Sequence, residues 1–193
     1  MVRTRTFDPS TALSTAVDLF ASKGYSDTSM DDIVKATGVS RYGIYGTFGN
    51  KRELFEQALE RYADGMGREL YMRLLEPDAS LAHIRRIFDE RIGDMCSTEE
   101  RKGCLFVHTA MQLATEDEEL QGVLQRFMKR ISKAFSIGLD SAKGRGEIRS
   151  DVDVDQAGML LTSTMFGLVV MGRTGFAEDV LESIVDGTLA GLQ

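Results

Sequence analysis

Residues 28–52, TSMDDIVKATGVSRYGIYGTFGNKR, decide the fold of this chain. Thr28 or Ser29 can cap a first short helix, because a hydroxyl oxygen accepts hydrogen bonds from the unpaired amides of a first turn. Gly38 ends this helix, since glycine adopts left-handed backbone angles at low cost. Ser40 can then cap a second helix directly after the turn. The stretch therefore predicts a helix-turn-helix.

The second of these helices carries polar and aromatic side chains on one face. Ile44 and Phe48 are spaced to face the core, which leaves Arg41, Tyr42 and Tyr45 directed outward. Guanidinium groups and phenol rings suit phosphates and base edges, so this face is expected to read DNA. A helix-turn-helix also occurs in proteins that do not touch DNA, and this alternative stays open.

The N-terminal part of the chain, from about residue 8 to residue 59, resembles the DNA-binding domain of TetR-type transcriptional regulators. The resemblance is carried by GVSRYGIYGTFGNKREL, residues 38–54, and by LFASKGYSDTSMDDI, residues 19–33. Several dispersed features agree at once, which makes the motif specific. Beyond these residues the chain resembles the family only in architecture.

The resemblance implies that Ser40, Arg41, Tyr42 and Tyr45 lie at the major groove and that Lys51 holds a phosphate. Gly43 and Gly46 depart from the family pattern, which usually has a hydroxyl residue and a larger polar or aromatic residue in their places. No base contact is therefore transferred to them. The full set of residues that we assign to DNA contact is Arg3, Arg5, Thr28, Ser29, Ser40, Arg41, Tyr42, Tyr45, Thr47 and Lys51.

Arg3 and Arg5 form a short basic arm before the first expected helix. Arms of this kind reach the minor groove or the phosphates in other DNA-binding proteins. A solvated terminus without fixed structure is an equally good interpretation.

The composition indicates an all-helical protein. The chain has 193 residues, of which only two are proline, and its apolar residues recur at the helical period. We expect a three-helix DNA-binding domain over residues 1–52 and a larger helical domain for ligand binding and dimerisation over residues 53–193. Few alternating stretches are present, so strands are not expected.

The charge of the chain is divided unevenly between these two parts. The net charge is −7, which argues against a DNA-binding protein when taken alone. Residues 1–52 nevertheless hold seven Lys or Arg and five Asp, a net charge of +2. The acidity therefore belongs to the second domain, and DNA would meet a locally basic surface.

The last two apolar stretches predict helices that start near residue 153 and near residue 178. The first is apolar on every side over residues 159–171, and such a helix must be covered on two faces. We therefore expect a homodimer built on both helices, although packing within a monomer is an alternative. The residues assigned to this interface are Met165, Leu168, Leu181, Ile184 and Val185.

Large and polarisable side chains of the second part can line a pocket for a small-molecule effector. Most side chains of this kind are ordinary core, and the sequence does not separate the two groups. The residues that we assign to the effector site are Cys104, His108, Phe88, Met95, Met111, Phe127 and Phe166.

Cys104 is the most specific of these residues. It follows Arg101 and Lys102 at the expected start of a helix, with His108 one turn later on the same face. Cations, an imidazole and a helix N-terminus all favour the nucleophilic thiolate. The segment KGCLFVHTA also resembles the glycine-cysteine-leucine segment of electrophile-responsive members of the family. The alternative is a small, buried, unreactive cysteine.

These observations predict a cytoplasmic, dimeric repressor that leaves a palindromic operator when a small molecule acts on it, with an electrophile sensed at Cys104 as one candidate. Two cysteines and two histidines argue against a metal site or a disulfide framework, and no cofactor motif or membrane span is expected. An enzyme is not expected. The alternatives are a helical protein-interaction module and a Cys-dependent enzyme, neither of which reads DNA.

Overall fold

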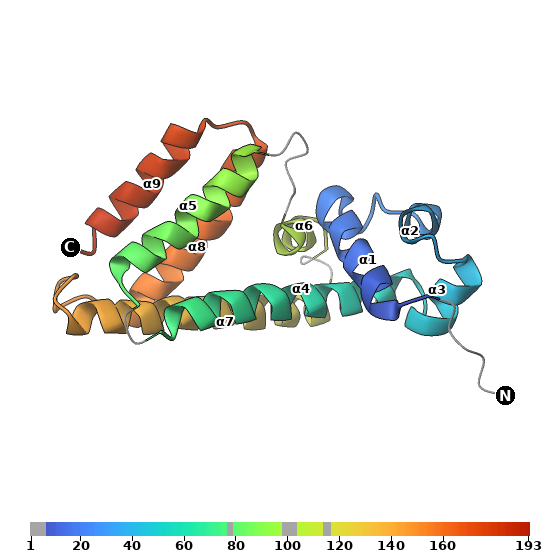
Figure 1. Ribbon diagram of the computed structural model, residues 1–193, viewed down its shortest axis with the longest axis horizontal. Helices are drawn as coiled ribbons and strands as arrows, with labels where there is room; N and C mark the ends of the chain where they lie inside the picture. The colour runs from blue at the N-terminus through green and yellow to red at the C-terminus, as the bar shows by residue number, and fades with distance from the viewer. Residues whose placement is uncertain (1–6, 77–78, 98–103, 114–116) are drawn as a thin grey trace. The chain divides into compact units, whose positions relative to one another are not determined.

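The computed structural model describes residues 7–76, 79–97, 104–113 and 117–193, and within these ranges it is built of helices without a strand (Figure 1). This confirms the predicted all-helical class. The helices of the described residues are α1 (Pro9–Lys23), α2 (Met30–Thr37), α3 (Arg41–Phe48), α4 (Lys51–Leu74), α5 (Leu81–Ser97), α6 (Leu105–Gln112), α7 (Glu118–Gly144), α8 (Val154–Arg173) and α9 (Glu178–Ala190).

Short polar side chains begin several of these helices. The Asp8 carboxylate accepts hydrogen bonds from the amides of Ser10 and Thr11 and caps α1, with Pro9 at its first position. Asn50 Oδ1 accepts from the amides of Arg52 and Glu53 at the start of α4. These side chains satisfy amides that have no partner within their own helix.

Packing divides the chain into two compact units. The first unit comprises residues 1–65 together with 104–120, and the second comprises residues 66–103 together with 121–193. The first unit therefore contains α1, α2, α3, the first part of α4 and also α6, which packs against α1. The chain enters this unit twice, because α6 is separated from α4 in sequence by a segment of the second unit.

An aromatic cluster forms the core of the first unit. The rings of Phe20 and Phe55 meet edge to face with centroids 5.1 Å apart, and the Tyr25 ring lies 4.8 Å from that of Phe55. Phe20 and Phe55 are fully buried. This cluster joins α1 to α4.

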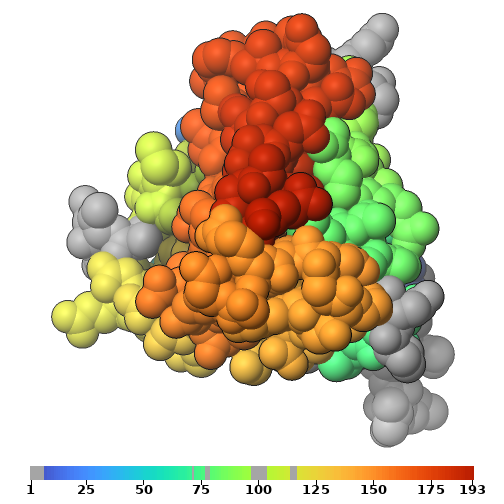
Figure 2. Space-filling view, turned by 90° about the vertical axis from the view of Figure 1, so that its left-hand side faces the viewer, coloured from blue at the N-terminus to red at the C-terminus, as the bar shows by residue number. Residues whose placement is uncertain are grey.

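The second unit is held together by contacts of α5 with α8 and α9, and of α8 with α9. Figure 2 shows α9, in red, beside α5, in green, on one face of this unit. The Arg149 amide donates to Leu192 O at 2.9 Å, which attaches the end of the chain to the turn between α7 and α8. A Cβ atom at Gly158 would lie 2.6 Å from Ser132 O, so α7 and α8 cross closely there.

Candidate nucleic-acid interface

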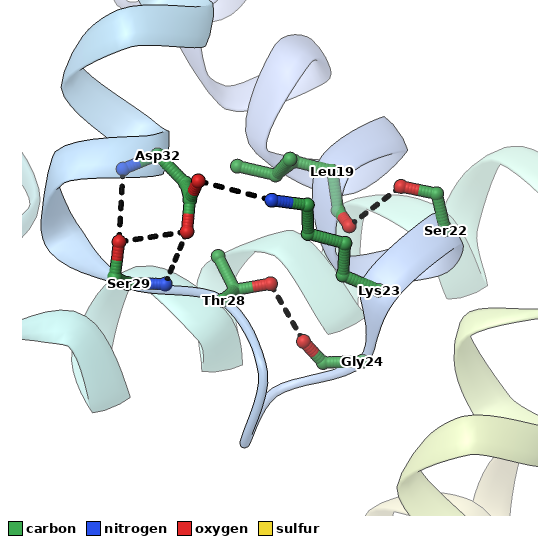
Figure 3. A network of polar contacts seen from close by, with 7 residues as sticks. All are labelled: Leu19, Ser22, Lys23, Gly24, Thr28, Ser29 and Asp32. Atoms are coloured by element: carbon green, nitrogen blue, oxygen red, sulfur yellow. Dashed lines mark hydrogen bonds and ion pairs between the residues drawn. The ribbon is translucent and has the colours of Figure 1, made fainter.

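The start of α2 is fixed by a reciprocal cap between Ser29 and Asp32 (Figure 3). Ser29 Oγ accepts from the Asp32 amide at 3.0 Å, and the Asp32 carboxylate accepts from the Ser29 amide at 2.9 Å. Lys23 at the end of α1 donates to the same carboxylate at 2.9 Å. The hydrogen bonds from Ser29, followed by that from Lys23, hold the pKa of Asp32 well below its ordinary value.

Two residues of the predicted DNA-contacting set serve the protein itself at this point. Thr28 is fully buried, and its hydroxyl donates to Gly24 O at 2.6 Å (Figure 3). The Ser29 hydroxyl is occupied by the cap. The Thr28 side chain is therefore absent from the surface, while Ser29 is exposed at the first turn of α2.

The turn between α2 and α3 has the conformation that the sequence predicts. Gly38 has a φ of 67° and donates to Val34 O, which closes α2 in the left-handed conformation. Ser40 Oγ accepts from the Gly43 amide at 3.1 Å and caps α3. The helix-turn-helix of residues 30–48 is thus built from caps that the side chains themselves provide.

The outer face of α3 displays the side chains that the sequence analysis directed outward. Ile44 and Phe48 are buried, whereas Tyr42 is 76% exposed and Tyr45 is 45% exposed. Arg41 is exposed as well. Two large aromatic residues on a solvent-exposed helix face are unusual unless that face binds a partner.

Arg41 has a partner that the sequence did not reveal. Arg41 Nη2 lies 2.5 Å from Asp31 Oδ1, with both side chains largely exposed. The hydrogen bond and the charge of Asp31 raise the pKa of Arg41. The spacing of ten residues gives no helical signal, because the turn between α2 and α3 determines which side chains meet.

Gly43 and Gly46 have different surroundings within α3. A Cβ atom at Gly43 would lie 2.9 Å from Val39 Cγ1 and 3.3 Å from Phe7 Cε1. A Cβ atom at Gly46 would meet nothing within 4 Å. Packing therefore explains the glycine at position 43, while position 46 leaves open space on α3.

The remaining residues of the predicted set lie at the edges of this surface. Thr47 is half-buried. Lys51 at the start of α4 is half-buried, and its Nζ lies 4.3 Å from the centroid of the Tyr25 ring. Burial lowers the pKa of Lys51, with Asp27 opposing this effect. Arg3 and Arg5 lie outside the described residues.

Arg52 is a further residue that sequence reasoning did not single out. It pairs with Asp117 at 2.6 Å and with Glu56 at 2.6 Å. The pair with Asp117, then the pair with Glu56, raises the pKa of Arg52. Asp117 also accepts from the Leu120 amide at 3.0 Å. Arg52 thus connects the first turn of α4 to the start of α7 within the first unit.

Cys104 lies at the N-terminus of α6, as the sequence predicts, and is buried. The Tyr62 hydroxyl donates to Cys104 Sγ at 3.4 Å. The Tyr62 ring lies 5.7 Å from that of Phe106, which follows Cys104 by two residues. His108 is half-buried one turn later. Cys96 is exposed at the end of α5.

The residues assigned to an effector site are divided between the two units. Cys104, His108 and Met111 belong to the first unit, and Met111 is 80% exposed. Phe88, Met95, Phe127 and Phe166 belong to the second unit, where Phe88 and Phe127 are buried. A pocket of the second unit has a different lining, formed by Met66, Glu69, Leu70, Arg73, Ile87, Arg91 and Met165.

The residues assigned to the dimer interface lie mostly inside the second unit. Met165, Leu168, Leu181 and Val185 are each at most 5% exposed, and Ile184 is half-buried. These side chains leave little surface for a second copy. The large exposed apolar side chains on or between α8 and α9 are Met159, Leu160, Val170, Phe176 and Val180.

The part of the chain that the structure describes holds no group of three His, Cys, Asp or Glu side chains that could bind a metal ion. One helix, α8, is long and apolar enough to cross a membrane by length and composition alone. A core or interface helix satisfies the same criterion, so this feature is weak evidence.

Comparison with known proteins finds matches to both parts of the chain. The sequence profile of the bacterial regulatory proteins of the tetR family matches residues 12–58. The profile described as the tetracyclin repressor-like C-terminal domain matches residues 80–185.

Similar proteins cover nearly the whole chain. The uncharacterized HTH-type transcriptional regulator YezE of Bacillus subtilis is 31% identical over 193 residues, which is 100% of both chains. The HTH-type transcriptional repressor ComR of Escherichia coli is 26% identical over 97% of this chain and 90% of its own. A cysteine mutant of the regulator CifR, solved with 26-base-pair operator DNA, is 25% identical with a TM-score of 0.85 and covers 99% of this chain and 100% of its own.

Proposed function

Because this chain belongs to the tetR family of bacterial regulatory proteins, we propose that it is a cytoplasmic transcriptional repressor. It binds a palindromic operator as a homodimer and releases that operator when a small molecule acts on the chain. The observation that carries this proposal is the exposed face of α3, where Arg41, Tyr42 and Tyr45 stand on a helix fixed by caps at its start. The structure of CifR with operator DNA supports the same proposal.

The side chains of this face divide by the contacts that they can make. Arg41 can donate two hydrogen bonds to a guanine edge, and each such pair discriminates against other bases. Tyr42 and Tyr45 offer a hydroxyl for phosphates and a ring for the thymine methyl group. Lys51 and the capped first turn of α4 suit a phosphate, since a helix N-terminus attracts negative charge.

The exposed apolar side chains of α8 and α9 support the proposed homodimer. Met159, Leu160 and Val170 are exposed on α8, Phe176 is exposed just before α9, and Val180 is exposed in its first turn. Large exposed apolar side chains on two helices that contact each other support an interaction surface here. A second copy is the occupant that we propose, because a two-fold dimer presents two reading helices to the two halves of a palindrome.

We further propose that an electrophile acting at Cys104 is the release signal. Addition of Cys104 Sγ to an electrophilic carbon–carbon double bond, with the thiol proton passing to the neighbouring carbon, would displace the Tyr62 hydroxyl, which donates to that sulfur. Cys104 belongs to the same compact unit as α3. Because the sulfur is buried, an adduct there would disturb the packing of α6 against α1.

Operator selection tests both parts of this proposal. The purified chain is used to enrich duplexes from a random pool at moderate salt, before and after treatment with a mild thiol-reactive electrophile. Cys104→Ser is compared with Cys96→Ser, which removes the exposed thiol and serves as the matched control. We expect an enriched palindrome that treated wild type and Cys96→Ser lose and that Cys104→Ser retains.

The possible results separate the two parts. Loss of binding that depends on Cys96 or on neither cysteine would overturn sensing at Cys104 and leave the repressor. Failure to enrich any duplex would overturn the DNA-binding proposal itself.

A further inference from the structure

The first turn of α2 carries two neighbouring aspartates with different partners. Asp32 completes the helix cap and binds Lys23, so its carboxylate is occupied by the fold (Figure 3). Asp31 takes no part in the cap and instead meets Arg41 at 2.5 Å. Its side chain is 86% exposed and that of Arg41 is 53% exposed.

The position of this pair matters for DNA binding. Asp31 is the second residue of α2 and Arg41 is the first residue of α3. Both therefore lie at helix N-termini, where backbone amides attract phosphates. A negative charge at this place opposes an approaching phosphate. A DNA group that binds Arg41 Nη2 must replace the Asp31 carboxylate, which already accepts from this nitrogen.

We infer that Asp31 is a positioning residue that holds the Arg41 guanidinium in the free protein and competes with DNA for it. This inference rests on the proposed function, because it concerns the same surface. The pair weakens binding and restricts Arg41 to one place on the surface. Asp31 thereby acts on DNA through Arg41.

The exposure of the pair limits the size of the effect. An exposed ion pair contributes little, so DNA can break it. Removing the carboxylate should therefore tighten binding by about two- to fivefold. Salt screens exposed charges, so this gain should shrink as the salt concentration rises.

The test is a double-mutant cycle of Asp31→Asn and Arg41→Ala in the full chain. Two probes are used, a random-sequence duplex at several salt concentrations and a heparin column. Asp18→Asn is the matched control, because Asp18 is exposed on α1 of the same unit and its loss changes the net charge equally. We expect Asp31→Asn to bind both probes more tightly than Asp18→Asn does, and to do so only when Arg41 is present.

Each result bears on the inference. A gain that persists in the Arg41→Ala background, or that equals the gain of Asp18→Asn, would overturn it. Weaker binding of Asp31→Asn than of wild type on the random-sequence duplex would also overturn it, because Asp31 would then support DNA binding. An Arg41-dependent gain on heparin by a chain that enriches no duplex would support the competition and refute the proposed operator binding.

Discussion

At the scale of single residues, different features of the structure explain why glycine stands at the two positions 43 and 46 of α3. Gly43 lies where a side chain would press on Val39 and Phe7, so the fold itself requires a small residue there. Gly46 faces open space. A glycine at such a place costs helix stability without a packing reason, which leaves close approach to a binding partner as the explanation that we favour.

Alanine substitutions should separate these two causes. Gly46→Ala should raise the free energy of unfolding by up to about 1 kcal/mol, because alanine favours the helix and meets no neighbour. Gly43→Ala should lower it, since the added Cβ atom would overlap Val39. Urea unfolding of both variants provides the comparison. A Gly43→Ala variant that is the more stable of the two would contradict this explanation.

Around α2 and α3, the sequence predicted features that depend on neighbouring residues better than contacts between residues far apart in sequence. The cap at Ser40, the left-handed Gly38 and the exposed side chains of α3 follow from neighbouring residues and helical spacing. The pair of Asp31 with Arg41 depends on how two helices cross, which no spacing rule encodes. The burial of Thr28, whose hydroxyl donates to Gly24 O, is likewise a packing feature that helical spacing does not give.

At the scale of secondary-structure elements, charged caps determine how the helix starts respond to acid. The Asp32 carboxylate joins the start of α2 to Lys23 at the end of α1. Its pKa is lower in the folded chain than its ordinary value. The folded chain therefore binds this proton less readily than the unfolded chain, and stability falls as the pH falls.

Asp32→Asn should reveal this contribution. The variant should be less stable than wild type at neutral pH, and the difference should shrink below about pH 4, where the unfolded wild-type carboxylate takes up its proton. Asp8 and Asp117 also have lowered pKa values, so the variant keeps part of the pH dependence. Urea unfolding at a series of pH values measures both effects. A constant difference down to pH 3, in roughly the range where the ordinary carboxylate titrates, would argue against the assignment.

At the scale of the whole molecule, the sequence identifies the apolar helices but does not give the orientation of their faces. Both sides of α8 are apolar, so periodicity does not tell which side faces the core. The residues first assigned to the dimer, such as Leu168 and Leu181, are buried within the second unit. The exposed set around Leu160 and Val180 replaces them in the proposed interface.

Charged substitutions should separate this interface from an ordinary surface. Leu160→Glu and Val180→Glu should shift the protein from dimer to monomer, because each would place a charge in an apolar contact. Met72→Glu is the control, since Met72 is 66% exposed on α4 of the second unit. Light scattering after size-exclusion chromatography gives the mass. Circular dichroism shows whether the variants remain helical, and an unchanged dimer mass in folded Leu160→Glu would rule out this surface.

The return of the chain to its first unit affects how members of this family can exchange parts. α6 packs on α1, although residues of the other unit separate it from α4 in sequence. A chimaera that joins the first 65 residues of this protein to the remainder of a relative would pair α1 with a foreign α6. Residues that meet there, such as Gly24 and Gln112, would then come from two different proteins. Recombination that preserves this contact must transfer two separate stretches of the gene together.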